Sequence, residues 1–127
     1  MRNVNYRDIT SWALACAATN VPETLPAASE YPERFRKSQN LHYQLMVMTE
    51  AINGDWVPNM EDTTQRKWSA WFWIVKEAAG FGLSLFGTGY SQAITALGSR
   101  LVFETEEQAK FAAKQFIKLY AEYYLRG

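Results

Sequence analysis

The stretch KWSAWFWIVK, residues 67–76, decides the fold, because it places Trp68, Trp71, Phe72 and Trp73 within six positions. Aromatic and β-branched residues fill this stretch and polar residues flank it, which is typical of a β-strand. Side chains alternate along a strand, so Trp68 and Phe72 belong to one face while Trp71 and Trp73 belong to the other. Because both faces are apolar, we expect the strand either to be covered on both sides or to expose one face at a binding surface.

Two further strands are expected after this one. In residues 77–91, apolar side chains alternate with glycines, which predicts a strand that bends or bulges at its glycines and turns near residues 87–89. Residues 99–105, SRLVFET, have the composition of a third short strand.

Helices are predicted where apolar residues recur at helical spacing. Residues 38–53 carry the clearest stripe, with gaps of four, three and four between Leu41, Leu45, Met48 and Ile52. A shorter stripe lies in residues 8–18, and a last helix follows a capping box formed by Thr105 and Gln108. Between the first two helices, residues 20–37 contain prolines and are expected to form an irregular connection.

The order of these elements, helix, helix, strand, strand, strand, helix, predicts an α+β fold in which helices pack on a small antiparallel three-stranded sheet. With 127 residues, of which 48% are apolar and 20% charged, the chain is expected to form a single globular domain over residues 1–127. Thirteen basic residues balance thirteen acidic ones, so no overall field draws the chain to nucleic acid or to an anionic membrane. The sequence shows no membrane-spanning run or secretion signal, and its one cysteine, Cys16, cannot form an internal disulfide. We therefore expect a cytoplasmic protein with no membrane partner.

Four segments carry a resemblance: EAINGDWVPN at residues 50–59, QRKW at residues 65–68, WF at residues 71–72, and LGSRLVFETEEQAKFAAKQFIKLY at residues 97–120. Together they resemble a group of small uncharacterised proteins encoded by bacteriophages, prophages and other mobile elements. In that group a helix ends in Ala-hydrophobic-Asn before a Trp-x-Pro turn, an aromatic strand follows, and a Phe-rich helix closes the chain. The resemblance implies an origin and a fold, and it carries no established activity.

No set of residues for catalysis or for binding a metal or cofactor stands out. The chain has one histidine, His42, and one cysteine, Cys16, so the usual ligands of a structural zinc and the usual pairing of a nucleophile with a base are missing. Asp55, Glu61 and Asp62 lie in the turn before the aromatic strand, and we interpret them as solvated loop residues rather than a catalytic carboxylate pair. We expect a protein that is not an enzyme and uses no cofactor or metal.

The candidate interaction surface consists of Trp71, Trp73, Arg66, Lys67 and Lys76. If one aromatic face of the strand is open, its large rings favour a protein partner, either an unknown protein or a second copy of the chain. The favoured interpretation is a non-catalytic accessory protein, derived from a phage or mobile element, that acts through protein–protein interaction. The alternative is single-stranded nucleic-acid binding, in which Trp71 and Trp73 stack bases while the basic residues neutralise phosphates. If the N-terminal helix with Trp12 covers that face, the aromatic residues are structural throughout.

Overall fold

The computed structural model describes residues 5–127, which adopt an α+β fold, as the sequence predicts. The helices are α1 (Trp12–Thr19), α2 (Glu33–Asn53), α3 (Glu106–Gln115) and α4 (Ile117–Arg126), the strands are β1 (Lys67–Glu77) and β2 (Gly80–Ser91), and two 3-10 turns are η1 (Tyr6–Asp8) and η2 (Ser99–Leu101).

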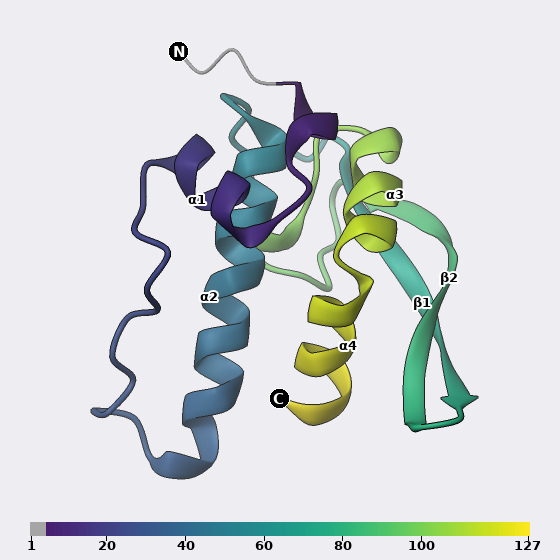
Figure 1. Ribbon diagram of the computed structural model, residues 1–127. Coiled ribbons are helices and arrows are strands. Elements are labelled where there is room, and N and C mark those ends of the chain that lie inside the picture. The colour runs from purple at the N-terminus through teal and green to yellow at the C-terminus, as the bar shows by residue number, and fades with distance from the viewer. Residues whose placement is uncertain (1–4) are drawn as a thin grey trace.

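The elements are arranged in layers around α2, the long central helix (Figure 1). α1 packs on one side of α2, and α3 and α4 pack on another. The two strands form a hairpin that stands beyond α3 and α4 and contacts both of them. The hairpin therefore lies at the periphery of the molecule rather than between helices.

The core lies where α2 meets its neighbours. Leu45, Met48 and Ile52, three members of the stripe predicted for this helix, are buried. Cys16 of α1 and Ala112 of α3 pack into the same cluster. Burial of each large apolar side chain contributes about 1.5–3 kcal/mol, so this cluster is the main source of stability.

β1 and β2 form a two-stranded antiparallel hairpin whose turn is at Ala78 and Ala79. Gly80 closes the turn with φ at 121°, a conformation that glycine adopts more readily than other residues. The turn predicted near residues 87–89 is wrong, because β2 continues through these residues to Ser91.

The hairpin contains a β-bulge. Trp71 pairs with Gly87 and Phe72 pairs with Leu85, which leaves Phe86 as an extra residue on β2. A bulge re-aims the side chain of the extra residue, and here that side chain is an aromatic ring.

The predicted three-stranded sheet is wrong, and so is the predicted order with three consecutive strands. The described residues form a two-stranded sheet, and residues 99–101 form η2 instead of a strand. Of the predicted third strand, Phe103 alone pairs, through an isolated antiparallel bridge to Trp68. The N–H of each residue donates to the carbonyl of the other at 2.9 Å.

The side chain of Asn53, the last residue of α2, explains why this segment does not pair further. The Asn53 Nδ2 atom donates to the Val102 carbonyl at 2.9 Å, and its Oδ1 atom accepts from the Glu104 N–H at 3.2 Å. The segment 102–104 is therefore bonded to Trp68 on one side and to the end of α2 on the other. Held there, the chain curls into η2 instead of continuing along β1.

Two helix boundaries also differ from the prediction. α2 begins at Glu33, inside the predicted irregular connection, and the Arg36 guanidinium ties its first turn to that connection by donating to the Tyr31 carbonyl at 2.9 Å. The predicted last helix has its capping box in place, but it is divided at Phe116 into α3 and α4.

Candidate functional site

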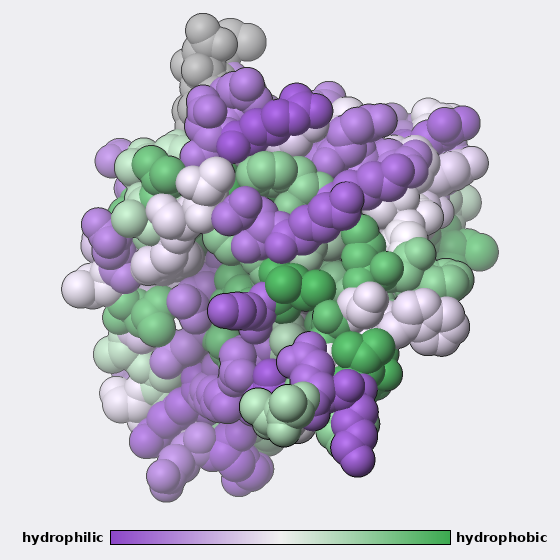
Figure 2. All heavy atoms as spheres, turned by 45° about the vertical axis from the view of Figure 1, so that its right-hand side comes forward, coloured by the Kyte–Doolittle hydropathy of each residue, from purple (hydrophilic) through white to green (hydrophobic). Residues whose placement is uncertain are grey.

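The outer face of the hairpin carries three exposed aromatic side chains, Trp71, Trp73 and Phe86, which are 60%, 59% and 63% exposed. We use the term outer face for these three residues and the strand backbone beneath them. Figure 2, turned so that the hairpin side comes forward, shows hydrophobic side chains gathered across the middle and right of the view with hydrophilic ones around them. A cluster of exposed rings on one strand pair is unusual for a surface that stays in water.

The opposite, inner face of the hairpin packs on α4. The Phe72 ring lies 5.3 Å from the ring of Tyr120 and 6.3 Å from that of Tyr124, and Leu83 of β2 is buried. Burial raises the pKa of the Tyr120 hydroxyl above its ordinary value. One aromatic face of β1 is therefore part of the core, and the other is open.

Trp12, the residue whose helix was a candidate to cover the outer face, lies elsewhere. Its indole N–H donates to the Glu23 carbonyl at 2.9 Å, and its ring packs on Tyr43 of α2 with the ring centroids 6.3 Å apart. α1 is separated from the hairpin by α2 and the C-terminal helices (Figure 1).

Contacts within the hairpin hold the outer rings in place. A Cβ atom added to Gly89 would lie 3.1 Å from Trp71 Nε1, so the indole rests directly on the glycine backbone. Trp73 packs edge-on against Phe86, with centroids 4.8 Å apart and ring planes at 77°. A pair of this geometry contributes about 0.5–1.5 kcal/mol. Rings that are ordered before binding lose less entropy when a partner covers them.

The outer face carries negative rather than positive charge. Glu77 belongs to this face by alternation along β1, and its carboxyl lies over Gly82 of β2. The small residues of β2, glycine above all, leave room for the side chains of β1 to lie across the hairpin.

Two of the predicted basic residues are exposed, but neither adjoins the outer rings. The Arg66 guanidinium lies 4.6 Å from the ring centroid of Tyr90, which in turn contacts Trp68 on the inner face. Lys76 is exposed near the tip of the hairpin, and alternation places its side chain on the inner face as well.

Lys67, the third predicted basic residue, is buried. Its side chain is 1% exposed, and its Nζ atom donates to the Asp62 carbonyl at 2.7 Å. The Asp62 carboxylate accepts from the Thr64 hydroxyl at 2.7 Å and from the Thr64 N–H at 2.9 Å, and these bonds lower the pKa of Asp62. Lys67 and Asp62 therefore shape the turn before β1.

The other candidate reactive groups have structural surroundings. Cys16 is buried, and its burial, with a smaller effect of Glu23, raises the pKa of the thiol. The His42 Nδ1 atom lies 3.2 Å from the Tyr123 hydroxyl, across the contact between α2 and α4. In the part of the chain that the structure describes, no group of three or more His, Cys, Asp or Glu side chains is placed to hold a metal ion.

A cavity of about 270 Å³ lies beside the turn at Trp56, with Glu50, Asp55 and Arg100 among its lining residues. Glu61 and Asp62 do not line this cavity. Sequence reasoning did not include Glu50 among the acidic residues near this turn. Glu50 lies in α2, and the end of that helix places it beside the cavity. The volume is below the range of about 300–1,000 Å³ typical of small-molecule pockets.

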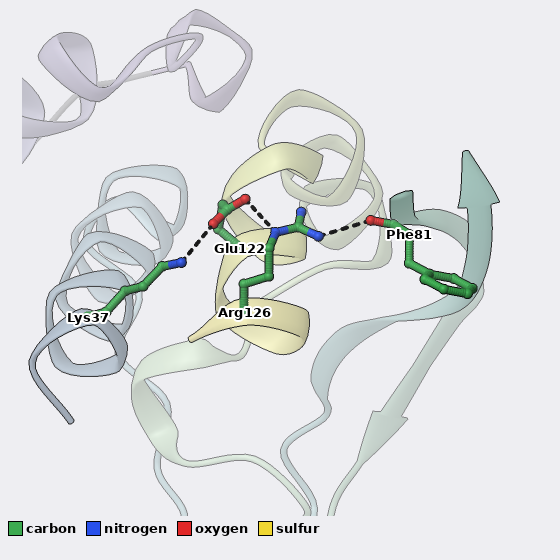
Figure 3. A network of polar contacts seen from close by, with 4 residues as sticks. All are labelled: Lys37, Phe81, Glu122 and Arg126. Atoms are coloured by element: carbon green, nitrogen blue, oxygen red, sulfur yellow. Dashed lines mark hydrogen bonds and ion pairs between the residues drawn. The ribbon is translucent and has the colours of Figure 1, made fainter. Parts of the chain in front are cut away.

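A chain of polar contacts fixes the hairpin relative to the helices (Figure 3). Glu122 of α4 pairs with Lys37 of α2 at 3.4 Å and with the Arg126 Nε atom at 2.7 Å. The Arg126 guanidinium also donates to the Phe81 carbonyl of β2 at 3.0 Å. The outer face is therefore carried by an anchored hairpin.

Comparison with known protein families, with curated proteins and with solved structures finds no match to this chain. Over residues 5–127, no helix is both long and apolar enough to cross a membrane.

Proposed function

We propose that this protein is a non-catalytic accessory module that binds another protein through the outer face of its hairpin. The observation that carries the proposal is the cluster formed by Trp71, Trp73 and Phe86, in which each ring is about three-fifths exposed and rests on a fixed neighbour. Large rings that are ordered in advance are the groups on which binding energy concentrates at protein interfaces. Glu77 adds a negative charge to this face, which favours a protein partner over a phosphate backbone.

The non-catalytic part of the proposal is supported by the surroundings of the groups that catalysis would need. Cys16 is buried with a raised pKa, Asp62 is bonded within its own turn, and His42 contacts Tyr123. The origin in a phage or mobile element and the cytoplasmic location remain predictions from the sequence.

Quantitative affinity enrichment from the cells that make the protein tests this proposal. Phe86→Ser removes one ring of the outer face at a bulge position that makes no ladder pair, so the strand register should persist. Ile94→Ser is the matched control, because its side chain is 82% exposed in the loop after β2. We expect a protein that the wild type and Ile94→Ser retain and Phe86→Ser loses, with purified components showing at least a tenfold weaker Kd, about 1.4 kcal/mol. If no partner depends on Phe86, the proposal is wrong.

Single-stranded nucleic-acid binding is the second candidate, and the exposure of Trp71 and Trp73 on one strand face favours it. It predicts saturable binding of labelled single-stranded DNA or RNA that weakens as salt increases. Replacing Trp73 by alanine should then weaken binding by about 1–3 kcal/mol. Fluorescence anisotropy at low and physiological salt separates this function from protein binding.

A further inference from the structure

One edge of the hairpin is unpaired beyond Trp68. Trp68 exchanges two backbone hydrogen bonds with Phe103, so the N–H and carbonyl groups of Trp68 point away from β2. In an antiparallel ladder the direction alternates with every residue. The residues of β1 that share this outward direction are Ala70, Phe72, Ile74 and Lys76. Among residues 5–127, no backbone hydrogen bond reaches their N–H or carbonyl groups from that side. We call residues 69–77 of β1 the free edge.

The edge of β2 is treated differently, because helices cover it. The Arg126 guanidinium donates to the Phe81 carbonyl at 3.0 Å, and the Glu106 carboxyl bonds the Thr88 side chain. α4 packs against β2, and α3 contacts both strands. Covering an edge with a helix or a charged side chain is how proteins prevent uncontrolled strand pairing. On the free edge of β1, residues 69–75 include no charged side chain, and the first one is that of Lys76.

An apolar groove runs beside the free edge. It has a volume of about 420 Å³ and is lined on its three sides by β1, by the loop after β2 and by α4, with Phe72, Ile74, Leu97, Tyr124 and Leu125 among its lining residues. A strand added to the free edge would direct every second side chain into this groove. The place beside β1 that a third strand would take is therefore open and apolar.

We propose that the free edge pairs with the free edge of a second copy of this chain, antiparallel about a two-fold axis, to form a four-stranded sheet. The free edge begins directly after the bridge at Trp68 and ends with β1 at Glu77, so Trp73 is its midpoint. A pairing that uses the whole edge puts Trp73 opposite Trp73 of the second copy. Alternation then makes Phe72 of one copy and Ile74 of the other a hydrogen-bonded pair. The inference rests on the proposed function, in that it takes the hairpin to be the part of the chain that binds protein.

Charge is compatible with this register. Lys76 of the second copy faces Ala70, and Glu77 of the second copy faces Ser69, so no like charges lie opposite each other. Because thirteen basic residues balance thirteen acidic ones, two copies carry no net repulsion.

The exposed area near the free edge matches what a specific dimer needs. Trp71, Trp73 and Ile74 are 60%, 59% and 65% exposed. At these fractions a large apolar side chain presents roughly 100 Å² or somewhat more. Counted over two copies, and with the lining residues of the groove other than Trp71 and Ile74 added, the apolar surface beside the edge is on the order of 1,000 Å², the lower bound for a specific interface.

Sedimentation equilibrium of the full chain from about 1 to 100 μM tests the inference by the mass of the species in solution. We expect a concentration-dependent dimer for the wild type. Ile74→Lys places a charge in the groove without removing a hydrogen bond of the hairpin, and it should weaken the dimer at least tenfold. Ile94→Lys makes the same exchange at a more exposed residue that does not line the groove, 82% against 65%, and should leave the dimer unchanged. A wild type that is monomeric at every concentration, or equal effects of the two variants, overturns the inference.

Disulfide trapping tests the register. In the proposed dimer, Trp73→Cys brings two cysteines face to face at about 4.5 Å between Cα atoms, which suits a disulfide. Trp71→Cys leaves its two cysteines four positions out of step, about 13 Å apart. Cys16 is buried and present in both variants, so it cancels in the comparison. Mild oxidation should link Trp73→Cys much faster than Trp71→Cys, and equal rates contradict the two-fold register.

The two proposals fail separately. Phe86 lies on β2, off the free edge, and contacts that edge through the Trp73 ring, so Phe86→Ser should weaken the dimer far less than Ile74→Lys while it removes a partner of the outer face. A monomeric protein that still loses a partner through Phe86→Ser retains the proposed function and overturns the second-copy inference. If a monomeric protein instead loses a partner through Ile74→Lys, the groove receives a strand from another protein, and the second-copy inference is again wrong.

Discussion

Replacing Asn53 by alanine measures how strongly the end of α2 holds the segment 102–104. The change removes the bond to the Val102 carbonyl at 2.9 Å and the bond from the Glu104 N–H at 3.2 Å. Val102 is 2% exposed, so water does not replace the lost donor, and an unsatisfied buried carbonyl costs about 1–3 kcal/mol. Glu104 is exposed, and the loss of its bond costs about 0.5–1.5 kcal/mol. The free energy of unfolding should fall by about 1.5–4.5 kcal/mol.

Urea denaturation followed by tryptophan fluorescence measures this change, with the m-value as the test that the unfolding reaction is unaltered. Asn40→Ala is the matched control, because it makes the same exchange in the same helix. Among the described residues the Asn40 side chain makes no hydrogen bond. Alanine has a higher helix propensity than asparagine, which adds about 0.5 kcal/mol of stability to Asn40→Ala. The same gain is smaller for Asn53→Ala, because Asn53 lies at the end of the helix.

The reasoning is refuted if the two variants differ by less than about 0.5 kcal/mol at equal m-values, an amount within ordinary surface variation. Asn53 would then not hold the segment, and the missing third strand would require another cause.

Three further predictions concern the thiol of Cys16, the buried side chain of Lys67 and the carboxyl group of Glu122. Because burial raises the pKa of Cys16, native protein should react with an alkylating reagent far more slowly at pH 8 than urea-unfolded protein, and equal rates would contradict its burial. Lys67→Ala should cost about 2 kcal/mol more in unfolding free energy than Lys67→Met, since methionine keeps most of the buried stem; equal costs would mean that the charge rather than the stem matters. Hydrogen bonding to Arg126, with a smaller effect of Lys37, lowers the pKa of Glu122, so its stabilisation is present above the ordinary glutamate value of about 4.3 and is lost as pH falls through the lowered pKa. Thermal unfolding should therefore show Glu122→Gln below the wild type in Tm at pH 7 and level with it in acid, and a Tm difference that persists in acid would contradict this account.

Local pattern was sufficient for much of this fold. The stripe containing Leu45, Met48 and Ile52 predicts a helix from spacing alone, and α2 buries those residues. Alternation along β1 also separates Phe72 from Trp71 and Trp73, and the structure packs Phe72 against Tyr120 of α4 while it leaves Trp71 and Trp73 exposed. These features depend on neighbours a few residues apart, which the sequence shows directly.

The features that sequence reasoning missed depend on distant partners. Residues 99–105 have the composition of a strand, yet their hydrogen bonds go to Asn53, which is 49 residues from Val102 along the chain. Lys67 stands at the start of a strand among polar residues, a setting in which lysine is ordinarily exposed, and its burial is a result of tertiary packing. The bulge at Phe86 could not be placed either, because glycine neighbours indicate a bend without indicating which residue is extra.

The missing third strand and the candidate site have one structural cause. Asn53 keeps the segment 102–104 at the base of the hairpin, and this segment therefore covers Trp68 and leaves the rest of the β1 edge open. An open edge bounded by an apolar groove is a hazard to a protein in isolation, since it will pair with whatever strand it meets. Arg126 and α4 cover the edge of β2. The fold therefore protects the edge of one strand and leaves the edge of the other open. A chain that covers one edge with a helix and holds the other open with a buried asparagine is best explained if the open edge is occupied in the working protein.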